Sequence, residues 1–159
     1  SMDYWSFDKQ YMDQALQEAQ KAFEKGEVPV GAVVVSPEGI VLGIGHNSVE
    51  TYYCQDRHAE MCAIRDACKQ LNNWRLDGCT IYVTLEPCVM CIGCIVLSRC
   101  ERLVYATESP EFGYHFGREN ICELYAKTIK NVTVGVCRDD SEELLRLFFK
   151  KRRTMYLKN

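Results

Sequence analysis

The sequence lacks any apolar run near the roughly 18 residues that a helix needs to cross a bilayer, which excludes a membrane-spanning helix. Glycine and proline are scarce, at 10 and 4 of 159 residues, so a collagen-like or low-complexity chain is also excluded. The first residues show neither the basic nor the apolar region of a signal peptide, and residues 1–2 are interpreted as an expression scar. We therefore expect a cytoplasmic protein with no membrane partner.

The composition that remains is typical of a globular protein, with 47% hydrophobic and 26% charged residues. A chain of 159 residues suits a single domain spanning residues 1–159. Ten cysteines are present, but the cytoplasm keeps thiols reduced, so a disulfide framework is not expected. Most of these cysteines are expected to pack as small hydrophobic residues, except those at metal-ligand spacing.

Positive charge is concentrated at one end of an otherwise acidic chain. The net charge is −3, yet the last ten residues hold five basic residues and no acid, which leaves −8 for the other 149. Such a run is often only a solvated helix face, but it can also neutralise phosphates. Residues 139–159 are predicted to form a basic C-terminal helix.

Hydrophobic periodicity predicts elements in the order αββαβαβαβα. Helices are expected at residues 6–25, 58–71, 88–99 and 119–127 and from Ser141 onward; strands are expected at residues 30–36, 40–45, 79–85, 102–107 and 132–137. The Pro-Glu-Gly turn at residues 37–39 favours an antiparallel hairpin, and the later strand-helix alternation favours parallel pairing. Residues 46–57 are expected to be a loop, and the helix at 88–99, which is almost uncharged on every side, is expected to be buried between other layers.

Two of the predicted helices begin with residues that bind metals. His58 and Glu60 open one helix, and Cys88 and Cys91 open the next. The two cysteines are three residues apart in a first turn, so their sulfurs share a face, and the helix dipole there favours thiolates. One imidazole and two thiolates suit Zn²⁺, and three protein ligands leave the open position that is typical of a catalytic zinc. Glu60, two residues from His58, is the candidate proton shuttle, although a regular helix would point it away from the ligands.

Other interpretations of the Cys-x-x-Cys pair remain at this point. Such pairs also occur in redox motifs and in structural zinc sites, where Cys54, Cys62 or Cys94 could supply a fourth ligand. A structural zinc has no use for the acid of His-Ala-Glu, which favours the catalytic interpretation. His-x-Glu followed by Pro-Cys-x-x-Cys is the signature of zinc-dependent nucleobase deaminases.

Four segments carry a close resemblance to bacterial tRNA adenosine deaminases, which convert the wobble adenosine of an arginine tRNA to inosine. They are residues 27–33 (EVPVGAV), 45–47 (GHN), 58–60 (HAE) and 82–91 (YVTLEPCVMC). The resemblance covers nearly the whole chain and implies a cytidine deaminase-like fold, a three-layer α/β/α sandwich around a five-stranded mixed sheet. It also implies a homodimer with one zinc ion per subunit, acting on A34 in a tRNA anticodon stem-loop.

The resemblance assigns a role to individual residues. Zinc would be bound by His58, Cys88 and Cys91. Glu60 would transfer protons while water attacks C6 of adenine and ammonia departs. The base would be bound by Asn47, which could instead cap a turn, and its pocket would be lined by Val30 and the backbone of Ala59. The anticodon loop would contact Phe149, Arg152 and Arg153, with one ring of the Phe148-Phe149 pair belonging to the core.

One segment, residues 108–117 (ESPEFGYHFG), departs from these relatives, which usually have an Arg-Asp pair and small residues there. Glu108 and Glu111 would oppose phosphates if they faced RNA, and Tyr114, His115 and Phe116 are bulky. This departure motivates a second hypothesis, a deaminase of a free base or nucleotide such as guanine. A non-catalytic zinc or redox module is the third. His46 is expected to be a solvent-exposed loop residue.

Overall fold

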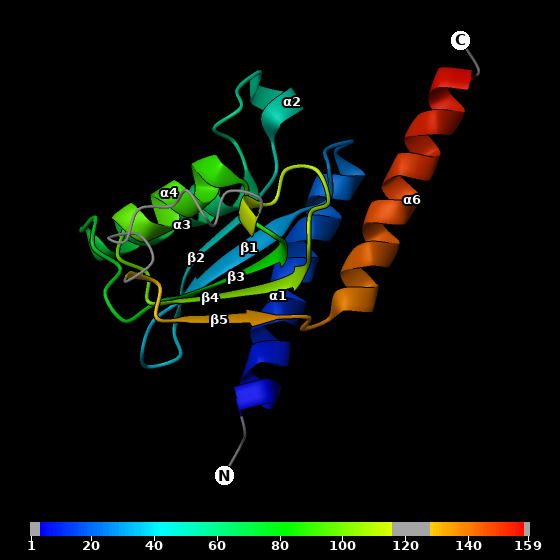
Figure 1. Cartoon of the computed structure of the whole chain (residues 1–159). Helices are drawn as coiled ribbons and strands as arrows, with labels where there is room; N and C mark the ends of the chain where they lie inside the picture. Colours follow the sequence, from blue (N-terminus) through cyan, green and yellow to red (C-terminus); the bar gives the residue numbers. More distant parts are fainter. Residues whose placement is uncertain (1–3, 116–127, 158–159) are drawn as a thin grey trace.

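The computed structural model describes residues 4–115 and 128–157, and there it shows a sheet between two layers of helices (Figure 1). The strands are β1 (Gly31–Val35), β2 (Val41–His46), β3 (Thr80–Leu85), β4 (Arg102–Thr107) and β5 (Asn131–Val134). The helices are α1 (Tyr4–Glu24), α2 (Val49–Tyr52), α3 (Ala59–Leu71), α4 (Val89–Leu97) and α6 (Arg138–Leu157). The α/β/α architecture predicted from the sequence is confirmed. The helix predicted at residues 119–127 lies outside the described residues.

The sheet has the order β2-β1-β3-β4-β5 and is mixed, as predicted. β1 pairs antiparallel with both β2 and β3, whereas β3 with β4 and β4 with β5 are parallel. The hairpin turn closes through Gly39, whose φ of 85° is readily adopted only by glycine. Because β3 and β4 are parallel, the segments that follow them leave the same edge of the sheet.

Residues alternate between the two faces of the sheet, as the strand period requires. Along β1, Ala32 and Val34 face the layer of α3 and α4, whereas Val33 and Val35 face α1. β3 and β4 repeat this alternation, with Ile81, Val83, Leu103 and Tyr105 on the first face and Tyr82, Val104 and Ala106 on the second. Two hydrophobic cores therefore hold the layers together, and the first one carries the two helices that begin with metal-binding residues.

Glycines in β2 allow α3 to lie directly on the sheet. A side chain at Gly43 or Gly45 would collide with the backbone of α3. These close approaches fix α3 over β2, and so fix the position of His58, which precedes its first residue.

Three local predictions were wrong. Residues 46–57 are not all loop, because they contain the short helix α2. α6 begins at Arg138 rather than Ser141: the buried Ser141 hydroxyl donates to the Thr84 carbonyl at 2.6 Å and so ties the helix to β3 instead of capping it. His46 is not a loop residue; it ends β2, and its ring lies 3.1 Å from both Glu18 Oε1 and Lys25 Nζ.

The expectation that α4 is buried between other layers was also wrong. Cys91, Ile92, Ile95 and Val96 are buried against the sheet. On the outer face, Val89 and Leu97 are 66% and 55% exposed. Within residues 4–115 and 128–157, the helix is therefore apolar all round but covered on one side only. None of the described helices is long and apolar enough to cross a membrane.

Candidate metal centre

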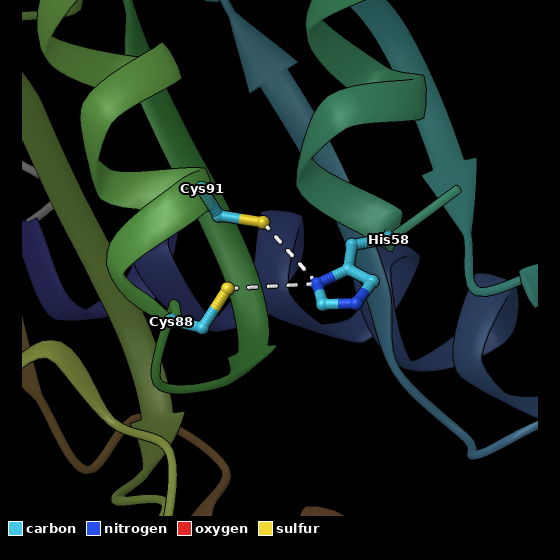
Figure 2. A group of neighbouring side chains, drawn as sticks. All are labelled: His58, Cys88 and Cys91. Atoms are coloured by element: carbon cyan, nitrogen blue, oxygen red, sulfur yellow. Dashed lines mark hydrogen bonds between the residues drawn. The ribbon is translucent and has the colours of Figure 1, made fainter. Parts of the chain in front are cut away.

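Two helix N-termini bring together the imidazole and the two thiols, as predicted. His58 is the N-cap of α3 and Cys88 the N-cap of α4, while Cys91 lies in the first turn of α4. The Sγ atoms of Cys88 and Cys91 lie 3.7 Å and 3.5 Å from His58 Nδ1, and both point at the ring (Figure 2). The three candidate ligand atoms all lie within 4.8 Å of one another. One nitrogen and two sulfurs at the vertices of so small a triangle form a donor set that fits Zn²⁺.

The pKa values of the two thiols are shifted in opposite directions. A hydrogen bond from the Cys91 thiol stabilises the Cys88 thiolate and, with a further contribution from His58, lowers the pKa of Cys88 to about 4. The same hydrogen bond, together with burial, raises the pKa of Cys91 above its ordinary value. The hydrogen bond with Cys88 also raises the pKa of His58. A thiol with a lowered pKa is suited to bind a metal, because the thiolate is the form that acts as a ligand.

Glu60 lies beside this cluster rather than pointing away from it. Its side chain is only 4% exposed and interacts with the thiol of Cys91. Burial raises the pKa of Glu60 to about 7, far above the ordinary value of 4.5. A carboxyl group that titrates near neutral pH can both accept and release a proton during a reaction.

The three residues assigned to the base pocket are joined by two hydrogen bonds, one between backbone groups and one to the Asn47 side chain. The Asn47 N–H donates to the Val30 carbonyl at 3.1 Å. The Asn47 Oδ1 accepts from the Ala59 N–H at 2.8 Å, so this side chain does cap the start of α3. Val30 and Ala59 are buried. The Oδ1 end of the Asn47 amide is therefore engaged by α3, and the NH₂ end is the end that can bind a ligand.

None of the alternative fourth ligands joins the cluster. Among the residues that the structure describes, the group that could hold a metal ion consists of His58, Cys88 and Cys91. The Cys94 Sγ lies 4.0 Å from the Ser98 hydroxyl, and the Cys54 thiol donates to the Asp56 carboxylate. All nine cysteines of the described ranges are free.

Comparison with known proteins identifies the family. The chain matches the model of the MafB19-like deaminases over residues 7–153. It is 44% identical over 147 residues to a tRNA-specific adenosine deaminase of Bacillus subtilis, and the match covers 92% of this chain and 91% of that protein. The chain belongs to the tRNA-specific adenosine deaminase family.

Solved structures of deaminases share the fold of this family member. A tRNA:A34 deaminase, studied for A-to-I editing at the wobble position, aligns with a TM-score of 0.76 at 35% identity, covering 86% of this chain and 99% of that chain. A guanine deaminase of Nitrosomonas europaea aligns with a TM-score of 0.73 at 26% identity, covering 88% and 83%. The same fold therefore serves both RNA and free bases.

In this deaminase the loop of residues 108–115 turns Tyr114 inward and leaves Phe112, which is 72% exposed, at the surface. Tyr114 is 5% exposed, packs edge-to-face on Tyr105 with ring centroids 6.4 Å apart, and donates its N–H to the Pro87 carbonyl. His115 pairs with the buried Glu86. Glu108 forms an ion pair with Arg138. Tyr114 and His115, which the sequence analysis singled out as bulky, therefore contact the protein itself; Phe116 lies outside the described residues.

Glu86 is a site residue that sequence reasoning missed. Its carboxylate accepts hydrogen bonds from the N–H groups of Ser109 and His115 and lies 2.7 Å from His115 Nδ1. Glu86 precedes Pro87 and Cys88, so it joins the loop to the turn that carries a metal ligand. The Glu-Pro-Cys motif contains this glutamate, but its role could not be predicted because its hydrogen-bond partners are 23 and 29 residues away in the sequence.

The C-terminal helix of the deaminase places its aromatic and basic residues outside the metal cluster. Phe148 is buried, with its ring centroid 6.3 Å from that of Phe23, whereas Phe149 is 45% exposed. One ring of the pair thus belongs to the core, as predicted. Arg152 lines a groove of about 640 Å³ between the end of α1, α2 and α6. Its guanidinium contacts the Gly26 carbonyl at 3.4 Å and Glu50 at 3.7 Å, while Arg153 is exposed.

Proposed function

We propose that this chain, as one domain over residues 1–159, catalyses the hydrolytic deamination of adenosine to inosine at A34 of tRNA. The observation that carries the proposal is the cluster of His58, Cys88 and Cys91 with the buried carboxyl of Glu60 beside it. A structural metal site has no use for an acid held near neutrality, whereas the replacement of an amino group by water requires two proton transfers.

The donor set fits one zinc ion per subunit, held by His58, Cys88 and Cys91. Zinc in such a site supplies Lewis acidity that makes water nucleophilic near neutral pH. Glu60 takes a proton from the attacking water, delivers it to the adenine ring, and then moves a proton to the departing ammonia. Its pKa of about 7 suits both directions of transfer.

The base is held by Val30, Asn47 and Ala59, which hydrogen bonds link to one another beside the metal cluster. Asn47 presents its NH₂ group to the purine, because its Oδ1 is occupied by the Ala59 N–H. Val30 and the Ala59 backbone line the pocket and exclude water from it. An oriented amide and an apolar wall are the features that small-molecule and base pockets share.

The RNA partner is an anticodon stem-loop, and we propose an arginine tRNA with A34. Phe149, Arg152 and Arg153 supply an exposed ring and two cations on one helix. Unpaired RNA needs a stacking surface together with partners for its phosphates. The groove beside Arg152 supports this role, because it lies between the end of α1, α2 and α6, and α2 begins two residues after Asn47.

A homodimer is supported by an apolar face of the α3/α4 layer that the described part of the chain leaves exposed. Val89 and Leu97 are exposed on α4, and Trp74, 57% exposed, lies beside the end of α4 with Arg99 5.8 Å from its ring centroid. Leu97→Lys should convert the dimer to a monomer in sedimentation velocity. Ile40→Lys, at an exposed position in the hairpin turn, should not.

The experiment that tests the substrate class incubates the zinc-loaded protein with a transcribed arginine tRNA bearing A34 and, separately, with free bases and nucleosides. We expect inosine at A34 and no ammonia from the small molecules. Release of ammonia from guanine with no inosine in the tRNA would overturn the proposal in favour of a free-base deaminase. This alternative is tested because the fold is similar to that of a guanine deaminase.

Contacts of the tail with RNA are tested separately by salt dependence. Arg152→Ala combined with Arg153→Ala should weaken binding of the anticodon stem-loop and reduce the slope of log K against log salt by up to about 2. Arg75→Ala, at an exposed arginine paired with Asp77, is the matched control and should leave the slope unchanged. An unchanged slope in the double variant would place the RNA elsewhere.

A further inference from the structure

The segment of residues 48–57, which contains α2, presents two exposed aromatic rings. Tyr52 is 56% exposed and Tyr53 is 94% exposed. The guanidinium carbon of Arg57 lies 4.2 Å from the centroid of the Tyr52 ring, within the range of a cation–π contact. The segment therefore carries an aromatic surface with a planar cation already stacked on it.

The backbone at Tyr53 adopts a conformation that tyrosine does not favour. Tyr53 is the C-cap of α2 and has a φ of 54° and a ψ of 40°, in the left-handed region that favours glycine or asparagine. At 94% exposure its ring gains almost nothing from packing. Strain at a residue that contributes no packing is characteristic of binding surfaces.

The segment is held rigidly from beneath. Glu27, buried beneath α2, accepts hydrogen bonds from the N–H groups of Glu50 and Thr51 at 3.0 and 2.7 Å and from the Thr51 hydroxyl at 2.6 Å. The Ser48 N–H donates to the Arg57 carbonyl at 2.9 Å and closes the base of the segment. A preorganised surface loses little entropy when it binds a ligand.

The position of the segment links it to the site. It leaves the sheet directly after Asn47, the proposed base-binding residue, and returns at His58, the proposed metal ligand. Glu50 of α2 contacts Arg152 of α6, so the segment also borders the basic helix; in Figure 1, α2 and α6 rise on the same side of the molecule. The other acid of the segment, Asp56, lies 4.0 Å from Arg57, so both acids are near arginines.

We propose that Tyr52, Tyr53 and Arg57 form a stacking platform for an unpaired nucleotide next to the target adenosine. The inference rests on the proposed function and names residues that determine how the RNA is held around the deaminated base. Base stacking tolerates nearby acids because it uses the π-face, and the phosphates are left to the cations of α6. A second copy of this chain is the other possible occupant, but the more apolar surface for self-association is the outer face of α4.

The direct test places 2-aminopurine on either side of the target adenosine in an anticodon stem-loop RNA. Wild type should quench its fluorescence at one of the two positions. Tyr53→Gly and Tyr52→Leu should restore the signal, whereas Tyr53→Phe should keep the quenching because the ring remains. In turnover, Tyr53→Gly should raise KM about fivefold or more with kcat within about twofold.

Stability provides the second measurement. Tyr53→Gly removes a side chain from a left-handed position, so its Tm should equal or exceed that of wild type although RNA binding is weaker. A structural role for Tyr53 would produce the opposite result, a lower Tm. Trp5→Leu is the matched control: Trp5 is 62% exposed near the N-terminal end of α1, far from α2 (Figure 1), and its replacement should change neither KM nor fluorescence.

The outcomes separate this inference from the proposed function. If wild type forms no inosine in the RNA, the proposed function fails and the platform fails with it. If wild type is active and Tyr53→Gly leaves both KM and 2-aminopurine fluorescence unchanged, only the platform is overturned. A change of oligomeric state in Tyr53→Gly, measured by sedimentation velocity, would instead assign Tyr53 to a subunit contact and would also overturn it.

Discussion

His115 Nδ1 lies 2.7 and 2.8 Å from the two carboxylate oxygens of Glu86, a residue whose side chain is fully buried. The Glu86 carboxylate also accepts hydrogen bonds from the N–H groups of Ser109 and His115. The loop after β4 is therefore fastened to the residue that precedes Pro87 and the metal ligand Cys88. This pairing gives the atypical residues of the loop a structural use and connects the loop to the site.

Replacing Glu86 should destabilise the fold. Glu86→Gln places an NH₂ group among three donors and leaves part of this buried network unpaired, so the free energy of unfolding should fall by about 3 kcal/mol. Urea denaturation at neutral pH measures the change. Glu111→Gln, on the same loop but exposed, is the control and should lie within about 0.5 kcal/mol of wild type. Equal stabilities for the two variants would contradict the role of Glu86.

Glu60→Gln should abolish turnover without removing the metal. The amide matches the carboxyl in shape but cannot shuttle protons, so kcat should fall at least about 100-fold. Single-turnover inosine formation and metal analysis of the same sample give the two readouts. Glu143→Gln, at an exposed glutamate on α6, serves as control. Substantial activity in Glu60→Gln would remove Glu60 from the proton transfers.

Sequence reasoning succeeded where the signal is local. The positions of His58, Cys88 and Cys91 follow from short motifs at helix starts, and the strands follow from alternation such as that of Val33 and Val34 in β1. The convergence of the two helix starts was also predictable, because each follows a loop or strand that ends at the same edge of the sheet.

Sequence reasoning failed where a distant partner decides the structure. α2 exists because the Glu27 carboxylate, 23 and 24 residues earlier, receives the N–H groups of its first turn. Ser141 does not cap α6 because its hydroxyl is taken by the Thr84 carbonyl, 57 residues away. The exposed residues Val89 and Leu97 of α4 are a further example, because an apolar helix sequence does not indicate which of its faces another element covers.

The anchoring of α2 by Glu27 should depend on pH. Burial favours the protonated form, but the hydrogen bonds from Thr51 and Glu50 outweigh it and hold the pKa of Glu27 below its ordinary value of 4.5. A carboxylate with a lowered pKa stabilises the fold above the pKa of the unfolded state, and this contribution is lost as the pH falls through the folded pKa. The stability difference between wild type and Glu27→Gln should therefore be about 1–3 kcal/mol at pH 7 and should shrink at acid pH.

Urea denaturation of both proteins from pH 7 down to about pH 3 measures this difference, because carboxyl groups common to both titrate alike and cancel. Glu24→Gln, at an exposed residue of α1, should show no such convergence. A gap between wild type and Glu27→Gln that stays constant as the pH falls would mean that the Glu27 charge does not anchor α2.

The number of protein ligands distinguishes a catalytic metal from a structural one. Cys88→Ser should lose zinc, because it removes one of the three donors found among the described residues, whereas Cys94→Ser should keep one zinc per chain, since the Cys94 sulfur lies near Ser98 and outside the cluster. Metal analysis after dialysis gives the stoichiometry, and cobalt(II) spectra report how many thiolates bind. If Cys94→Ser lost its zinc or a thiolate band, the site would have a fourth protein ligand. The metal would then be structural, and Glu60 would have no water to activate.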